Sequence, residues 1–190
     1  MKKPQAAILA VALFAGVAAL SGCAESGEST DATANGGAAT TTSASAKAGT
    51  ATRGTAVGDL APEFQLTRTD GSPVSLDSLR GQPAVVVFWT AWCPFCKEEA
   101  PHINALAAQY EARGVRVLGI NIQDSEARTA GGVREFGIRY AVARDTDAKV
   151  AKLYKVQGTP TVLFLDRGGV VRYNGNELPK DYAARLDALL

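Results

Sequence analysis

The chain has few of the side chains that bind transition metals. Its 190 residues include three cysteines and one histidine, and the first cysteine, Cys23, lies at the end of an apolar N-terminal segment. The other two cysteines are too few for a zinc site with four cysteine ligands, and the single histidine, His102, argues against a mixed cysteine and histidine site. Lys97 follows Cys96 directly, where covalent haem attachment requires histidine. We therefore expect neither a metal nor another cofactor.

The sequence also lacks an excess of charge of either sign. It has 20 lysine and arginine residues and 19 aspartate and glutamate residues, which gives a formal net charge of +1. These charges are scattered along the chain, and no basic stretch with interleaved aromatic residues is present. A nucleic-acid partner is therefore not expected.

The N-terminal segment has the pattern of an export signal. Two lysines precede an apolar run of 15 residues at 6–20, and Leu-Ser-Gly-Cys occupies residues 20–23. A membrane span needs roughly 20 apolar residues, so we favour a cleaved signal peptide over residues 1–22. The Leu-Ser-Gly-Cys sequence resembles the bacterial lipoprotein signal, which implies that Cys23 becomes a lipidated N-terminus. A plain cysteine beside an ordinary cleavage site is the alternative.

Two regions of different composition follow the signal. Of the 33 residues at 24–56, 27 are alanine, glycine, serine or threonine. Such a segment cannot bury enough apolar surface to offset the entropy lost on ordering, so residues 23–56 are predicted to be a lipidated, disordered tether. Residues 57–190 then form one domain, whose 134 residues are a typical size for a single hydrophobic core.

Hydrophobic patterns within the domain predict strands that alternate with helices. Continuous apolar runs indicate strands buried on both faces, and Asp-Gly or Gly-Gly pairs indicate hairpin turns. The predicted elements are a hairpin at 64–76, strands at 84–89 and 115–122, helices at 94–112, 127–136 and 146–154, a second hairpin at 161–173 and a helix at 179–190. This order indicates an α/β sandwich around a mixed sheet.

Cys93-Pro94-Phe95-Cys96 lies where the apolar run at 84–89 gives way to a helical pattern. Two thiols at this spacing, at a helix start, can cycle between dithiol and disulfide without a rearrangement of the fold. Unpaired backbone N–H groups and the helix dipole stabilise a thiolate at the first cysteine. The segment is therefore interpreted as a redox motif. An inert structural disulfide is disfavoured, because so short a loop adds little stability.

The motifs around the cysteine pair are similar to those of a known family. Residues 88–96 read Phe-Trp-Thr-Ala-Trp-Cys-Pro-Phe-Cys, Glu-Glu-Ala-Pro follows at 98–101, and Gly-Thr-Pro-Thr stands at 158–161. In this order and spacing they resemble the thioredoxin superfamily, and within it the membrane-tethered TlpA/ResA/DsbE-like thiol-disulfide oxidoreductases of the redoxin type. The resemblance covers residues 57–190. It implies a thioredoxin fold, in which helices flank a central mixed sheet and the first hairpin is an N-terminal extension.

The resemblance implies a role for five residues. Cys93 would be the nucleophile that forms a mixed disulfide with a substrate, and Cys96, one helical turn further along and less exposed, would resolve that intermediate. Pro160 would follow a cis peptide bond and face the cysteines, and Thr159 would offer its backbone groups to a substrate strand. Glu99 stands where this branch carries a glutamate, three residues after the second cysteine. It lies about 60° from Cys96 around the helix axis, so it is our candidate acid or base, with a solvated carboxylate as the alternative.

Three more residues are candidates for binding a substrate. Trp92, Pro94 and Phe95 flank the thiols, although core packing is an equal interpretation for Trp92. One position departs from the pattern of thioredoxin itself, which carries a buried aspartate six residues before its first cysteine. Val87 occupies that position here, so proton transfer would fall to Glu99.

On this resemblance the chain is an enzyme of the cell envelope, anchored to the bacterial membrane by a lipid on Cys23. Its partners would be protein thiols and disulfides, with a membrane dithiol as electron donor or acceptor. We favour a reductase of envelope proteins, as in cytochrome c maturation, and an oxidase that donates disulfides to secreted proteins stays open. A peroxiredoxin-type peroxidase is less favoured, because Val86 stands where that family has proline, although Thr90 matches its threonine. The intact cysteine pair argues against a binding domain without catalytic activity.

Overall fold

The computed structural model describes residues 52–190. The predicted signal peptide, the predicted lipidation of Cys23 and the tether up to residue 51 lie outside the described residues. Within 52–190, no helix is both long enough and apolar enough to cross a membrane.

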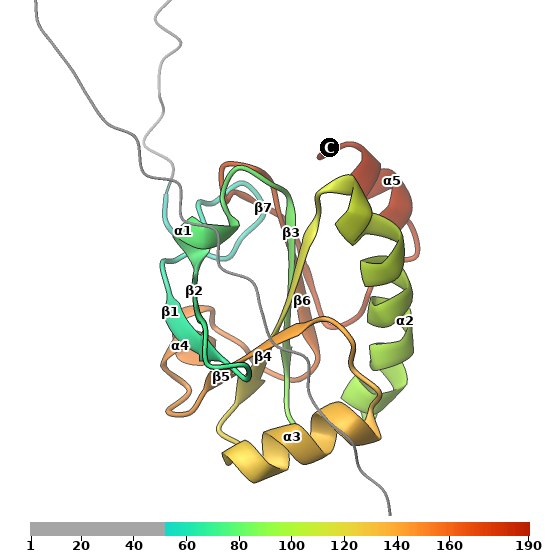
Figure 1. The fold of residues 1–190 in the computed structure, drawn as a ribbon. Helices are drawn as coiled ribbons and strands as arrows, with labels where there is room; N and C mark the ends of the chain where they lie inside the picture. Colours follow the sequence, from blue (N-terminus) through green and yellow to red (C-terminus); the bar gives the residue numbers. More distant parts are fainter. Residues whose placement is uncertain (1–51) are drawn as a thin grey trace, which may run out of the picture. The chain divides into compact units, whose positions relative to one another are not determined.

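A seven-stranded mixed sheet forms the centre of the described domain (Figure 1). The strands are β1 (Gln65–Arg68), β2 (Pro73–Ser75), β3 (Ala84–Trp89), β4 (Arg116–Ile122), β5 (Ala141–Asp145), β6 (Thr161–Leu165) and β7 (Val171–Gly175). Their order across the sheet is β2-β1-β5-β4-β3-β6-β7. Strands β3, β4 and β5 are parallel, whereas β6 is antiparallel to β3 and β1 is antiparallel to β5. This is the central mixed sheet, extended by an N-terminal hairpin, that the sequence predicts.

Helices cover both faces of this sheet. They are α1 (Leu76–Leu79), α2 (Pro94–Tyr110), α3 (Glu126–Glu135), α4 (Lys149–Leu153) and α5 (Tyr182–Asp187), with a 3₁₀ turn, η1 (Glu111–Arg113), after α2. Side chains of α1 and α4 pack with Val86 and Phe88 of β3, and those of α2 and α5 pack with Val85, Val87 and Trp89. Strand β3 is therefore buried on both faces, which explains its uninterrupted apolar sequence.

Several elements differ from the prediction. Residues 76–79 form the short helix α1, although Leu76 is predicted at the end of the first hairpin, and α5 covers Tyr182–Asp187 within the predicted 179–190. Strand β5 was not predicted, because it is short and its residues Ala141 and Arg144 are only half-buried. Helix α4 begins at Lys149 rather than near Thr146, since Ala148 has a φ of 55°, outside the helical region. Its N-terminal amides are capped by a residue of β5: the Asp145 carboxylate accepts hydrogen bonds from the amides of residues 150 and 151, at 3.2 and 2.7 Å.

The last residues of the predicted tether contact the domain. The Leu60 amide donates to the Thr52 carbonyl oxygen at 2.9 Å, and the Gly54 amide donates to the Leu60 carbonyl oxygen at 3.0 Å. The Asn174 side-chain amide, on β7, donates to the Thr55 carbonyl oxygen at 2.9 Å. Backbone hydrogen bonds thus join residues 52–56 to the domain. The prediction of a tether considers only the lack of large apolar side chains, so it does not detect these bonds.

Candidate active site

The strand pairing brings the two predicted parts of the site together. Strand β3 is antiparallel to β6, and Phe88 near the end of β3 pairs with Thr161 at the start of β6. The residues that follow β3 and those that precede β6 therefore meet at one edge of the sheet. At this edge the Cys93 thiol lies 3.1 Å from the carbonyl oxygen of Thr159, to which it donates a hydrogen bond. The Thr159–Pro160 peptide bond is cis, as the resemblance implies.

Cys93 occupies the N-cap position of α2 and Pro94 its first turn. Its extended backbone, with φ of −86° and ψ of 114°, places the sulfur over the start of the helix. There the Cys96 amide donates a hydrogen bond to the Cys93 sulfur at 3.1 Å. An N–H group at a helix N-terminus stabilises negative charge on such an acceptor. The two thiols are free in the structure.

The two cysteines are buried to a similar extent but face different surroundings. Cys93 is 3% exposed and Cys96 is 5% exposed, so the expectation that Cys96 is the less exposed of the two is wrong. Cys93 faces the Thr159 carbonyl oxygen, whereas Cys96 lines an internal cavity. Burial, followed by its hydrogen bond with Cys93, raises the pKa of the Cys96 thiol to about 12. Cys96 is therefore protonated at neutral pH and needs a base before it can attack a disulfide.

Glu99 lies next to this internal cavity. The cavity has a volume of about 10 Å³, room for about one water molecule, and is lined by Cys96, Glu99, Tyr140 and Pro160 among others. One Glu99 oxygen accepts a hydrogen bond from the Leu178 amide at 2.9 Å, and the side chain is 15% exposed. The carboxylate is thus fixed and mostly buried. This geometry favours the acid or base over the solvated carboxylate.

Glu99 also borders a larger hollow on the protein surface. That hollow has a volume of about 340 Å³, and its lining includes His102, Glu177 and Lys180. The exposed His102 ring lies 3.6 Å from the second Glu99 oxygen. Glu99 therefore stands between the internal cavity beside Cys96 and the solvent, a position from which a proton can be exchanged in both directions.

Trp92, Pro94 and Phe95 form an exposed apolar surface around the buried Cys93. Trp92 is 68% exposed and Phe95 is 66% exposed, and Pro94 is also exposed. Core packing is therefore excluded for Trp92, whereas Trp89 is buried. Exposed large apolar residues beside a reactive group are typical of a surface that binds a partner.

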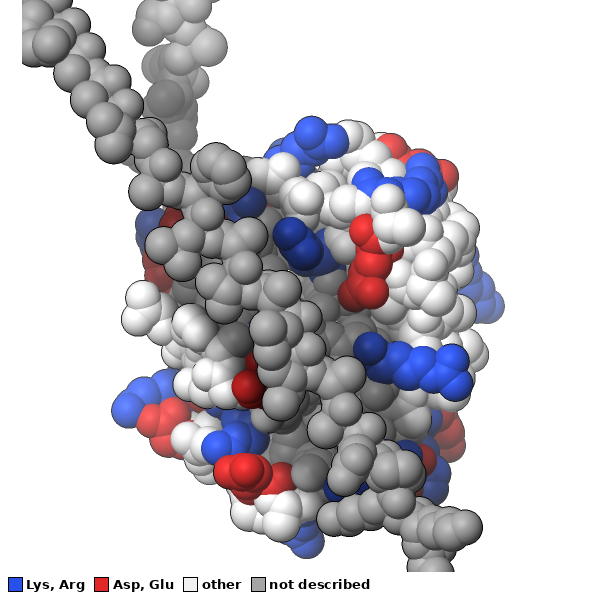
Figure 2. Space-filling model, in the orientation of Figure 1, with Lys and Arg blue, Asp and Glu red and all other residues white. Residues whose placement is uncertain are grey.

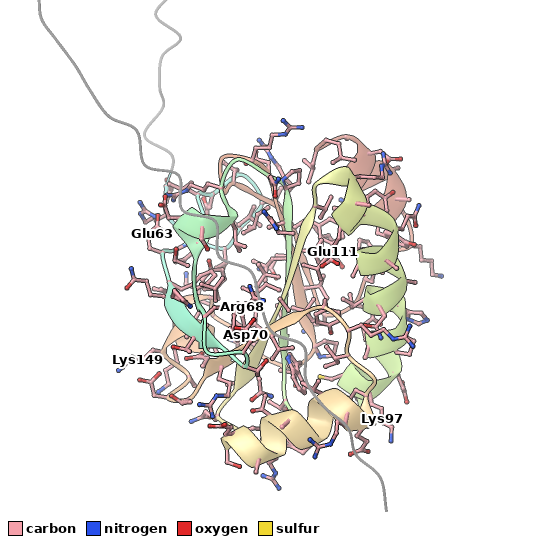
Figure 3. All side chains as sticks on the ribbon, viewed as in Figure 1. Glu63, Arg68, Asp70, Lys97, Glu111 and Lys149 are labelled. Carbon is pink, nitrogen blue, oxygen red and sulfur yellow. The ribbon has the colours of Figure 1, made fainter. Side chains whose placement is uncertain are left out.

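The charged residues near the thiols interact mainly with other side chains. Lys97, at the start of α2 (Figure 3), forms an ion pair of 2.8 Å with Glu135 at the end of α3. Val87 lines the internal cavity and supplies no carboxylate there. Positive and negative side chains are interspersed on the visible face of the domain (Figure 2), in agreement with their scatter along the sequence.

The sequence did not reveal two residues of the site. Tyr140 lines the same cavity as Cys96 and Glu99. Burial raises the pKa of the Tyr140 hydroxyl, and the charges of Cys96 and Glu99 raise it further. Asn176, after β7, donates a hydrogen bond to the Pro160 carbonyl oxygen at 3.2 Å and so fixes the cis-proline loop. Neither residue belongs to a local motif, so a signal for them would require knowledge of the strand pairing.

The fold and the site together define a thioredoxin-fold protein with a paired-cysteine centre. One thiol faces a cis-proline loop beside an exposed apolar surface, and the other lines a small cavity together with the mostly buried Glu99 carboxylate. Such an arrangement can form a mixed disulfide at the first sulfur and deprotonate the second.

Comparison with known proteins is consistent with this class. The chain belongs to the AhpC/TSA family, whose model matches residues 57–174. The thiol-disulfide oxidoreductase ResA of Oceanobacillus iheyensis is 33% identical over 119 residues, which are 60% of this chain and 62% of the relative. ResA of Geobacillus kaustophilus is 29% identical over 136 residues, which are 70% of this chain and 78% of that relative. The chain thus matches less than two thirds of the length of the first relative.

Solved structures show the same fold. A putative thiol:disulfide interchange protein DsbE from Chlorobium tepidum has a TM-score of 0.63 and 29% identity, over 70% of this chain and 94% of that one. A secreted Mycobacterium tuberculosis disulfide oxidoreductase, described as homologous to E. coli DsbE, has a TM-score of 0.58 and 30% identity, over 66% of this chain and 96% of that one.

Proposed function

We propose that this chain is a thiol-disulfide oxidoreductase that acts outside the cytoplasm, held at the membrane by a lipid on Cys23. The observation that carries the activity is the position of the Cys93 sulfur, 3.1 Å from the Thr159 carbonyl oxygen of the cis-proline loop and 3.1 Å from the Cys96 amide. The names of the ResA relatives support the reaction class, and the secreted M. tuberculosis neighbour supports the location.

The first step is an attack by Cys93 on a substrate disulfide. The Cys93 thiol first releases its proton to solvent. A new bond then forms between the Cys93 sulfur and one substrate sulfur, and the other substrate sulfur leaves as a thiolate, which takes up a proton from solvent. The substrate chain lies along the Thr159 backbone, while its apolar side chains contact Trp92 and Phe95. Main-chain hydrogen bonds of this kind give affinity for many sequences, and the apolar contacts add selectivity.

The second step releases the substrate. Glu99 accepts the proton of the Cys96 thiol across the internal cavity, and the Cys96 sulfur attacks the Cys93 sulfur. The Cys93–Cys96 disulfide forms, and the second substrate sulfur leaves as a thiolate. Two electrons have then passed from the enzyme to the substrate. An external dithiol, which we place at the membrane, must return them before the next cycle.

We infer that the enzyme works mainly as a reductase of envelope or secreted proteins, as in cytochrome c maturation. A strongly oxidising site requires groups that stabilise the reduced thiolate. In the described part of the chain, the hydrogen-bond donor to the Cys93 sulfur is the Cys96 amide, and the nearby Lys97 is paired with Glu135. Donation of disulfides to secreted proteins is the second candidate, because it uses the same residues in reverse.

The reduction potential of the full chain, measured against glutathione, tests this direction. A potential near that of thioredoxin, about −270 mV, supports the reductase, and one above about −180 mV supports the oxidase. The Cys96→Ala variant tests the activity itself, because a mixed disulfide on Cys93 can no longer be resolved and substrates stay attached. A Cys93→Ala variant is the matched control and should retain none.

Mass spectrometry of the membrane fraction tests the lipid on Cys23, which a Cys23→Ala variant should lose.

A further inference from the structure

A network of buried, hydrogen-bonded polar side chains connects α3 and β4 to the loop before Cys93. Asn121, Asp124 and Thr129 are 1%, 5% and 0% exposed. The Thr129 hydroxyl donates to the Asn121 side-chain oxygen at 2.8 Å, and the Asn121 amide donates to the Asp124 carboxylate at 2.9 Å. The same carboxylate oxygen accepts a hydrogen bond from the backbone amide of Ala91 at 2.7 Å. This hydrogen-bond network therefore ends at Ala91, two residues before the nucleophile Cys93.

The sheet topology explains why these residues meet. Strands β3 and β4 are parallel, and Trp89 at the end of β3 pairs with Asn121. The segments that follow the two strands leave the sheet at the same edge, where α3 and the start of α2 also lie (Figure 1). Residues 90–92 connect β3 to α2 at this edge. The position of this connection determines where Trp92 and Cys93 lie, because Trp92 is its last residue and Cys93 follows directly.

Helix α3 holds the same connection through close packing. A Cβ atom at Gly132 would lie 2.7 Å from the Cβ of Ala91 and 2.9 Å from the Trp89 ring. Real Cβ atoms essentially never make contacts this short, so the close approach of the helix to the loop depends on glycine at residue 132. Ala91 is thus held by the hydrogen bond that its amide donates to the Asp124 carboxylate and by its close packing against Gly132.

A buried carboxylate is costly unless its hydrogen bonds compensate for the loss of water. Asp145 provides a comparison, since it is 1% exposed and accepts two backbone N–H bonds at the start of α4. That carboxylate stabilises a helix start that does not carry the thiols. Asp124 also accepts a charge-assisted hydrogen bond from a backbone amide, but this amide belongs to Ala91, in the loop that leads to Cys93.

We propose that Asp124 is a positioning residue for thiol exchange. Acting through the Ala91 amide, it holds residues 90–92 so that the Cys93 sulfur faces Thr159 and Trp92 stands beside it. It does not contact the reacting atoms. The proposal rests on the function proposed above, because it assigns Asp124 to the formation of the mixed disulfide.

The test compares two buried aspartates in a Cys96→Ala background, where Cys93 is the one thiol of the domain. In the full chain, Asp124→Ala should slow mixed-disulfide formation with a peptide disulfide by about tenfold, since a misplacement of about 1 Å can cost up to about 100-fold. Iodoacetamide should alkylate Cys93 faster in the same variant, because the buried thiol loses its fixed contact with Thr159. Asp124→Asn keeps an oxygen acceptor and should restore both rates to within about twofold.

Asp145→Ala is the matched control for a merely structural role. It should lower the melting temperature and leave both Cys93 rates unchanged. Equal rates in folded Asp124→Ala and the parent, or an equal loss in Asp145→Ala, would overturn the proposal. If Asp124→Ala does not fold, Asp124→Ser carries the same expectation, because its shorter side chain cannot reach the Ala91 amide. Failure of the parent to react with any peptide disulfide, with alkylation still dependent on Asp124, would instead refute the proposed function.

Discussion

Replacement of Glu99 by glutamine should separate the two steps of the exchange reaction. Burial raises the pKa of the Cys96 thiol from an ordinary 9.0 to about 12. At neutral pH the Cys96 thiolate is therefore only a very small fraction, and a base must remove the thiol proton before resolution. A positioned base typically contributes about 10²- to 10⁴-fold in rate. We therefore expect Glu99→Gln to slow the resolution of the mixed disulfide by at least about 100-fold.

The same variant should leave the first step unchanged. Glutamine has the size of glutamate and retains an oxygen that can accept the hydrogen bond from the Leu178 amide, so the loop after β7 keeps its place. Cys93 does not depend on Glu99 for its contact with the Thr159 carbonyl oxygen. The mixed disulfide should therefore form at the parent rate and then accumulate.

A single-turnover experiment measures both steps. The reduced full chain is mixed with a peptide disulfide, quenched with acid at intervals, and the mixed disulfide and released dithiol are quantified by mass spectrometry. Because the Cys96 pKa lies near 12, the slow step of Glu99→Gln should accelerate about tenfold for each pH unit above 7, as the thiolate fraction rises. The parent should show a weaker dependence, since Glu99 already removes the proton.

Glu98 supplies the control, because it is a neighbouring but exposed carboxylate on the same helix. Glu98→Gln should behave as the parent in both steps. Release at the parent rate by Glu99→Gln at pH 7 would refute the reasoning, and so would an equal slowing of both steps.

Two further predictions concern the surface and the packing of the site. Trp92→Ala and Phe95→Ala should raise KM for a protein disulfide several-fold, because their exposed rings supply apolar contact area, and should leave the melting temperature and the reaction with a small aromatic disulfide unchanged. Equal losses with both substrates would contradict a binding role. Gly132→Ala should lower the free energy of unfolding by about 1–3 kcal/mol, because the new methyl group overlaps Ala91. Gly131→Ala, where a Cβ meets nothing within 4 Å, should raise it by up to about 1 kcal/mol, and denaturant titration measures the difference.

Much of the fold follows from local patterns in the sequence. The apolar run of β3, the helical pattern after Pro94 and the Asp-Gly turn at residues 70–71 each correspond to an element of the structure. These signals are readable because the physical cause lies within a few residues: burial on both faces, a helix start, and a tight turn. Strand β5 escaped detection because its position between β1 and β4, and not its own hydrophobicity, makes it a strand.

Several parts of the site depend on contacts between distant residues. The Cys93 thiol and the Thr159 carbonyl oxygen are 66 positions apart, the Glu99 carboxylate and the Leu178 amide 79, and the Asp124 carboxylate and the Ala91 amide 33. The resemblance to a known family placed Pro160 opposite the cysteines and suggested Glu99, but it did not indicate the hydrogen bond from Cys93 to Thr159. It did not indicate Asp124 or Tyr140, which belong to no motif that the sequence displays.

The sequence alone therefore determined that this chain carries a redox-type cysteine pair at the start of a helix, because strand, turn and helix signals adjoin one another at Cys93. The tertiary structure decided the environment of each thiol. Cys96 lines a small cavity together with the mostly buried Glu99 carboxylate, and the Ala91 amide in the loop before Cys93 donates a hydrogen bond to Asp124. The physical reason is that burial and hydrogen bonding depend on which strands pair, and that pairing joins segments whose local sequences carry no information about one another.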